Sequence, residues 1–93
     1  MGESVEDVRK RIDAVDLELL AALSRRAELG ARIGRIKEEL GRAIEDIERE
    51  EEIIRRLREQ NPGPLDGRAI ERIFRTIIAE TKNIERARSE GGS

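Results

Sequence analysis

The sequence predicts an all-α fold: a three-helix protomer with one very long first helix, paired into an intertwined homodimeric helical bundle. Good helix formers dominate the chain and valine and threonine are scarce. Apolar residues recur at helical spacing, and the glycines and prolines cluster at a few points. The 93 residues suffice for one domain. We place that domain at 5–89 and expect 1–4 and 90–93 to be disordered or expression-derived ends.

The first helix is expected from about residue 5 to about residue 40. Ser4 followed three residues later by Asp7 resembles a capping box, and Gly41 marks the end of the helix. About 35 residues rising 1.5 Å each span roughly 50 Å, which two shorter helices of one small chain cannot cover. We therefore expect a second copy to cover the rest of the apolar face. Steps of four and three residues, with one step of seven across position 26, connect its members Val8, Ile12, Val15, Leu19, Ala22, Leu29, Ile33, Ile36 and Leu40.

Two shorter helices are expected to follow. The second spans about 46–60, and the run Asn61-Pro62-Gly63-Pro64 after it is the strongest break in the chain. Asp66 is well placed to cap a third helix over about 67–89. The apolar residues of the third helix again recur at steps of three and four, so this helix is expected to bury one face.

The composition excludes several classes of function. The 19 basic and 21 acidic residues leave a net charge of −2, which disfavours bulk attraction to nucleic acid or an anionic membrane. The chain lacks cysteine and histidine, and with them disulfides, thiolate nucleophiles and the commonest metal ligand. No apolar run approaches the roughly 18 residues of a membrane span, and no signal peptide opens the sequence. We expect a cytoplasmic protein with no metal and no cofactor.

Charged residues interrupt the apolar face of the first helix. Position 26 should be apolar, but it is Arg26, and Lys37 follows 11 residues later. Eleven residues are almost three turns, so the two cations point the same way with backbones roughly 16 Å apart. Unpaired buried cations are costly, which indicates a negatively charged ligand between them. Arg9 lies 17 residues before Arg26, about 100° around the helix, so it cannot easily point into the same pocket within one chain. In a dimer it could point into the pocket of the partner.

The other two helices also carry polar residues on apolar faces. Asp46, Arg49 and Glu50 open the second helix at spacings of three and four, and Thr81 and Glu85 continue the apolar face of the third. Each has a simpler explanation, namely an intrahelical ion pair, a tolerated polar residue or, for Glu85, a frayed and solvated helix end. Taken together with the cations of the first helix, they describe a partly buried cationic pocket suited to a small dianion.

The ordered set of these residues resembles the all-helical chorismate mutases. The resemblance extends from about Val8 to Glu85, without gaps through the first two helices. It is carried by VRKRIDAVD at 8–16, LL at 19–20, RRAEL at 25–29, IGRIK at 33–37, DIERE at 46–50, IF at 73–74 and II at 77–78. The resemblance implies an intertwined homodimer with two active sites. It also implies the Claisen rearrangement of chorismate to prephenate, on the way to phenylalanine and tyrosine.

By position, the resemblance implies four catalytic residues. Arg26 looks like the arginine that grips one substrate carboxylate from within the chain, and Arg9 like the arginine donated across the dimer to the other. Lys37 resembles the lysine that contacts the ether oxygen of the breaking bond, and Glu85 stands opposite it, where relatives have Gln or Glu. The reaction needs no nucleophile, metal or cofactor, so the missing histidine and cysteine are no obstacle.

The resemblance also implies further substrate-binding residues. Asp46 is expected near the ring hydroxyl, Glu50 as the acceptor of a hydrogen bond from that hydroxyl, and Arg49 in the charge network around the substrate. Thr81 takes a place where the family often has a small hydroxyl residue. Lys82 is polar where some relatives are apolar.

Three alternatives stay open on the sequence alone. An enzyme of the same fold could act on isochorismate as a pyruvate lyase. The chain could be a regulatory or partner-dependent mutase domain that works with another enzyme of the shikimate pathway. It could also be a non-catalytic helical dimer or adaptor, in which case Arg26 and Lys37 would tolerate apolar replacements.

Overall fold

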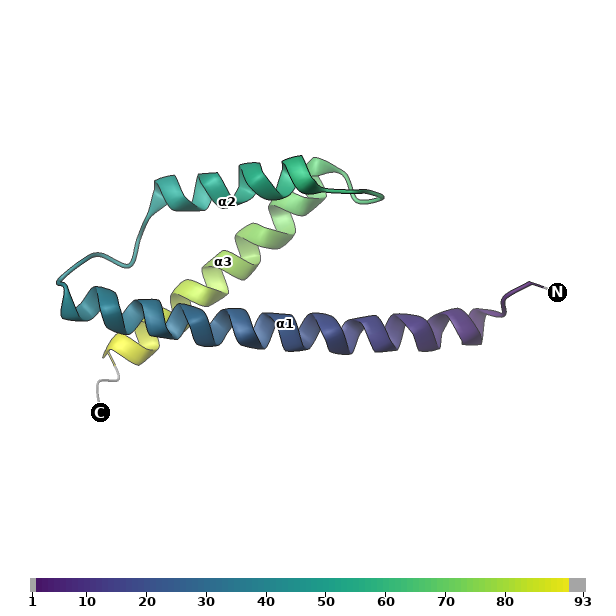
Figure 1. The fold of residues 1–93 in the computed structure, drawn as a ribbon, viewed down its shortest axis with the longest axis horizontal. Coiled ribbons are helices and arrows are strands. Elements are labelled where there is room, and N and C mark those ends of the chain that lie inside the picture. The colour runs from purple at the N-terminus through teal and green to yellow at the C-terminus, as the bar shows by residue number, and fades with distance from the viewer. Residues whose placement is uncertain (1, 91–93) are drawn as a thin grey trace.

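Three helices make up the protein in a computed structural model that describes residues 2–90 (Figure 1). Helix α1 spans Val5–Glu39, α2 spans Ile47–Gln60 and α3 spans Gly67–Glu90, and no strand occurs within 2–90. The all-α prediction is confirmed, and each helix ends within one residue of its predicted limit.

The structure describes some residues of the two ends that we predicted to be disordered or expression-derived, but not all of them. Residues 2–4 precede α1, whereas Glu90, which we assigned to the C-terminal end, is the last residue of α3. Met1 and residues 91–93 lie outside the described residues. The division into one domain with two short ends stays a prediction.

Side-chain caps fix the beginning of all three helices. The Ser4 Oγ accepts a hydrogen bond of 3.0 Å from the backbone N–H of Asp7, as the predicted capping box requires. Asp46 Oδ1 accepts from the N–H of Arg49 at 3.0 Å, and Asp66 Oδ1 accepts from the N–H of Ala69 at 2.8 Å. The predicted cap at Asp66 is confirmed. These caps matter for function because two of them set where α2 and α3 begin and hence which side chains face α1.

Helix α3 packs against both other helices, crossing the C-terminal half of α1 and reaching α2 (Figure 1). Close approach to α1 is possible because Gly30, Ala31 and Gly34 present almost no side chain at the crossing, and all three are buried. A Cβ built on Gly34 would lie 3.0 Å from Glu85 Cα and 3.1 Å from the Glu85 carbonyl oxygen. The crossing therefore brings the last turns of α3, with Glu85, directly onto α1.

We expect Gly34→Leu to lower the free energy of unfolding by roughly 2 kcal/mol, the middle of the usual range for overpacking. Leucine favours a helix more than glycine does, so a loss of stability must come from pushing α3 away from α1. Thermal unfolding followed by circular dichroism measures it, with Arg35→Leu on the exposed side of α1 as the control. Equal melting temperatures for Gly34→Leu and the control would contradict the close crossing.

The N-terminal half of α1 extends beyond the other helices and exposes its apolar face (Figure 1). Leu20 is 60% exposed, and among the residues whose burial the structure describes the buried apolar side chains are Ala31, Ile54 and Ile78. The radius of gyration is 16.9 Å, against about 12 Å for a compact chain of this length. The accessible surface is 7459 Å², against about 5,500 Å² for a compact monomer. This single chain thus exposes on the order of 2,000 Å² of surface that a compact fold would bury.

Charged residues separate most of the exposed apolar positions of α1, although residues 19–23 form an uninterrupted apolar run. Within residues 2–90, no helix is both long enough and apolar enough to cross a membrane. Exposed apolar residues among many charged ones are typical of a helix that packs against other helices.

Candidate active site

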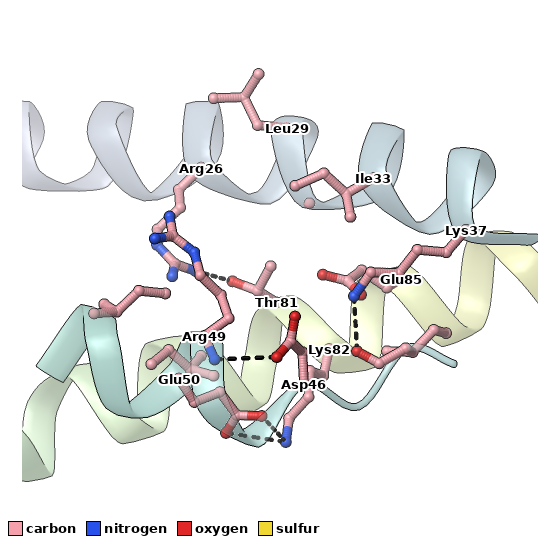
Figure 2. A pocket seen from close by; sticks show the side chains of 14 residues that line it. Arg26, Leu29, Ile33, Lys37, Asp46, Arg49, Glu50, Thr81, Lys82 and Glu85 are labelled. Atoms are coloured by element: carbon pink, nitrogen blue, oxygen red, sulfur yellow. Dashed lines mark hydrogen bonds and ion pairs between the residues drawn. The ribbon is translucent and has the colours of Figure 1, made fainter. Parts of the chain in front are cut away.

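A pocket of about 280 Å³ lies where the C-terminal half of α1, the connection 40–46, the start of α2 and the end of α3 meet (Figure 2). Its size is near the lower end of the range of about 300–1,000 Å³ for small-molecule sites. The lining residues are Arg26, Leu29, Gly30, Ile33, Lys37, Ile44, Asp46, Arg49, Glu50, Ile53, Ile78, Thr81, Lys82 and Glu85.

Every site residue predicted to act within its own chain lies on this pocket: Arg26, Lys37, Asp46, Arg49, Glu50, Thr81 and Glu85. Arg26 and Lys37 extend from α1 toward the same cavity, as their spacing of 11 residues requires (Figure 2). The structure brings these seven side chains together, and the role of each in a reaction stays a prediction.

Two guanidinium groups lie side by side at one end of the pocket (Figure 2). Arg26 Nη1 donates a short hydrogen bond to Thr81 Oγ1, and Thr81 Oγ1 in turn donates to the Ile77 carbonyl oxygen at 2.9 Å. Among the described residues, no carboxylate comes within 4.0 Å of the Arg26 guanidinium. Burial, and next to it repulsion from Arg49, lowers the pKa of Arg26 below its usual value. An anionic group bound here would stabilise the buried charge of Arg26 and reduce its repulsion from Arg49.

Lys37 occupies the opposite end of the pocket. Its Nζ donates to the Ile44 carbonyl oxygen at 3.0 Å, which anchors the ammonium to the connection between α1 and α2. An ammonium group has three N–H donors, so this bond leaves others for a ligand. Its positive charge also acts on the carboxyl group of Glu85. A donor is thereby held at a defined place in the cavity before any ligand binds.

Glu85 is buried, with 7% of its surface exposed, and its Oε2 has no hydrogen-bond partner. The alternative of a frayed, solvated helix end is therefore wrong for this residue. Burial raises the pKa of Glu85 above its usual value, and the positive charges of Lys37 and Arg26 act in the opposite direction. A carboxyl group in such surroundings takes up a proton more readily than one in water, and the protonated form can donate a hydrogen bond.

The two acidic residues at the start of α2 have different partners. Asp46 uses one oxygen to cap α2 through the N–H of Arg49, and Figure 2 shows its carboxylate directed toward the pocket. The Glu50 carboxylate contacts Lys82 Nζ at 3.2 Å. The Arg49 guanidinium pairs with Glu52 at 2.7 Å.

Sequence reasoning missed part of the site. It noted Lys82 without giving it a partner, and it did not foresee the Ile44 carbonyl as an anchor for Lys37. It also did not identify Ile53 and Ile78 as apolar wall of the pocket. Helical periodicity could have placed Lys82, which follows Ile78 by four residues on the same face.

Arg9 is the one predicted site residue that does not line the pocket. Its side chain is 68% exposed and pairs with Glu6 on the same helix at 3.1 Å. It lies on the N-terminal half of α1, which extends away from α2 and α3 (Figure 1). As the sequence indicated, one chain cannot bring Arg9 to its own pocket, and whether it reaches that of a partner stays a prediction.

Comparison with known proteins adds independent evidence. A profile of the family described as chorismate mutase type II matches residues 8–86. The chain is 32% identical over 90 residues to the bifunctional chorismate mutase/prephenate dehydratase of Neisseria gonorrhoeae, covering 92% of this chain and 24% of that protein. It thus spans about a quarter of the length of this bifunctional relative.

Two further relatives match over most of both chains. The chorismate mutase of Methanocaldococcus jannaschii is 32% identical, covering 92% of this chain and 88% of that protein. Among solved structures, form II of the chorismate mutase from Thermus thermophilus superposes with a TM-score of 0.88 at 37% identity. That match covers 90% of this chain and 96% of the other, so the helical arrangement is shared nearly end to end.

Proposed function

The chain belongs to the chorismate mutase type II family, and from that membership we propose that it catalyses the rearrangement of chorismate to prephenate. The observation that carries the proposal is the paired Arg26 and Arg49 guanidinium groups, where Arg26 has no carboxylate partner among the described residues. Chorismate carries two carboxylates, and arginine is the usual partner of a carboxylate because its planar fork matches both oxygens.

Binding supplies the first part of catalysis. Chorismate must adopt a compact conformer before its two reacting carbons can approach each other. Arg26 would hold one carboxylate from within the chain, and Arg9 of the partner subunit the other. Fixing both ends restricts the substrate to the reactive shape, so that much of the entropic cost is met on binding.

Charge stabilisation supplies the second part. As the C–O bond breaks, negative charge builds on the ether oxygen. Lys37 would donate to this oxygen from one side and a protonated Glu85 from the other. Both donors stabilise the transition state more than the ground state, because the charge is largest there. The anchoring of Lys37 by Ile44 and the burial of Glu85 support these roles.

The ring hydroxyl of the substrate would lie at the start of α2. Glu50 would accept a hydrogen bond from this hydroxyl, with Asp46 close by and Arg49 in the charge network around the substrate. Thr81, which contacts Arg26, would help to fix the direction of that guanidinium. These assignments rest on family position, and the placement of all five side chains on one pocket supports them.

The working form is proposed to be an intertwined homodimer with two sites. The apolar face of α1 is exposed, and the accessible surface of the chain is larger than that of a compact monomer. Both observations support a second copy that packs on this face. Antiparallel pairing of two α1 helices would carry the N-terminal half of one toward the pocket of the other, and Arg9 with it. The cytoplasmic location expected from the composition stays a prediction.

Loss of chorismate absorbance with purified protein, together with detection of prephenate, tests the proposed reaction. Release of pyruvate from isochorismate without turnover of chorismate would favour the lyase instead. A chain that changes neither compound, alone or with an added partner enzyme, would be an adaptor, and the proposed function would be wrong.

We expect turnover to fall as the pH rises through the pKa of Glu85. The donor is the protonated form, burial raises the pKa, and ionisation at higher pH turns the group into an acceptor. In Glu85→Gln the amide donates at every pH, so we expect a flat profile. Measuring kcat between about pH 5 and 8 for both proteins checks this. A flat profile for the parent protein would contradict the role of Glu85.

A further inference from the structure

Lys82 places its ammonium group between two carboxylates from different segments. Nζ lies 3.2 and 3.4 Å from the two carboxylate oxygens of Glu50 on α2 (Figure 2). It also lies 2.9 Å from Glu45 Oε1 in the connection between α1 and α2. Lys82 itself belongs to α3 and lines the pocket. One cation thus joins three segments that form one wall of the site.

The pair formed by Lys82 and Glu50 is well shielded from water. Their side chains are 19% and 17% exposed, whereas the other ion pairs of the described residues involve more exposed groups. Among those residues Lys82 is the cationic partner of Glu50, while Glu45 has a second one in Arg86 at 3.4 Å. The hydrogen bond with Glu45 is the largest cause that raises the pKa of Lys82, so the ammonium stays charged.

Acidic residues that line a pocket repel a dianionic ligand unless their charge is neutralised. Asp46, Glu50 and Glu85 all line the cavity. Glu85 is buried where protonation is favoured, and Asp46 caps α2, where the helix dipole stabilises negative charge. Glu50 also lies in the first turn of α2, but its carboxylate lines the cavity, and without Lys82 it would repel an anionic ligand at short range with little screening.

We propose that Lys82 is a positioning residue, which cancels the charge of Glu50 and holds its carboxylate at the pocket so that a dianion can bind. This inference rests on the proposed function, because it concerns the same site and the same dianionic substrate. Lys82 would not contact the reacting atoms. It would act through Glu50, and its effect should therefore appear in binding more than in the chemical step.

Replacement of the lysine by a chain of similar length without charge tests this directly. For Lys82→Met we expect KM for chorismate to rise about tenfold with kcat within about twofold of the parent. Adding Glu50→Gln removes the stranded charge and keeps a carbonyl acceptor, so KM of the double variant should fall below that of Lys82→Met and come within about threefold of that of Glu50→Gln alone. Lys82→Arg should keep KM near the parental value because the charge is retained.

Arg86→Met is the matched control, since it removes the other cation on Glu45 and leaves Glu50 paired. We expect it to leave KM unchanged, and circular dichroism melting of all variants separates a loss of fold from a loss of binding. An unchanged KM in Lys82→Met would overturn the proposal. A double variant no better than Lys82→Met would also overturn it, because the lysine would not be acting through Glu50.

Calorimetric binding of prephenate to the same proteins separates this inference from the proposed reaction. The same order of dissociation constants is expected, with Lys82→Met weakest and the double variant recovered. If the parent protein leaves chorismate unchanged but the prephenate affinities follow this order, the proposed reaction fails and the role of Lys82 stands. If the parent is active and the affinities are equal, the role of Lys82 fails.

Discussion

Lys37→Met is expected to lower kcat for the conversion of chorismate by about 10²–10³, the usual effect of removing one donor from a developing negative charge. Methionine has nearly the length of lysine and fills the same space, but it cannot donate a hydrogen bond. Because the lost interaction grows as the C–O bond breaks, kcat and kcat/KM should fall together, with little change in KM. Steady-state kinetics on the two purified proteins measures the effect.

The geometry explains why the effect should be large. The Ile44 carbonyl oxygen holds the Lys37 ammonium at 3.0 Å, so the donor need not reorganise when charge develops. Arg35→Met is a matched control, because it removes a cation from the exposed side of the same helix two residues away. A kcat for Lys37→Met within threefold of the control would show that the ether oxygen is stabilised by another group.

Much of this site was predictable because its spacing is local to one helix. Arg26 and Lys37 both lie on α1, so helix geometry alone fixes that they point the same way. The positions of Asp46, Arg49 and Glu50 on α2 follow from the same rule, and so do those of Thr81 and Glu85 on α3. In each case the residue was conspicuous as a charge or hydroxyl on an otherwise apolar face.

The remainder depends on how the helices approach one another, which periodicity does not encode. Glu85 is buried because α3 crosses α1 at Gly34, where a side chain would collide with it. The anchor of Lys37 is a backbone carbonyl in an irregular connection, and Lys82 meets Glu50 only when α2 and α3 are docked. Such contacts join residues that are distant in sequence, so no local sequence pattern predicts them.

Arg9 lies on the half of α1 that has no partner within this chain, so its loss should affect a site that two chains share. Arg9→Ala and Arg26→Ala should each lower kcat/KM for chorismate by about 10²-fold or more, because each leaves a substrate carboxylate without its arginine in a shielded site. If the two arginines belong to different chains of one site, a heterodimer of the two variants has one site with both arginines and one with neither. Refolding the variants together at equal concentration should therefore restore about a quarter of the parental activity.

The control is a mixture of Arg26→Ala with Arg49→Ala, since both residues line the pocket from the same chain. Every site in that mixture lacks one arginine, so mixing should restore nothing. The placement of Arg9, 68% exposed on the half of α1 that extends beyond α2 and α3, permits action only across a dimer. If the Arg9 and Arg26 variants also fail to complement each other after exchange of subunits, the site is not shared between chains. The exposed face of α1 would then need an occupant other than a second copy.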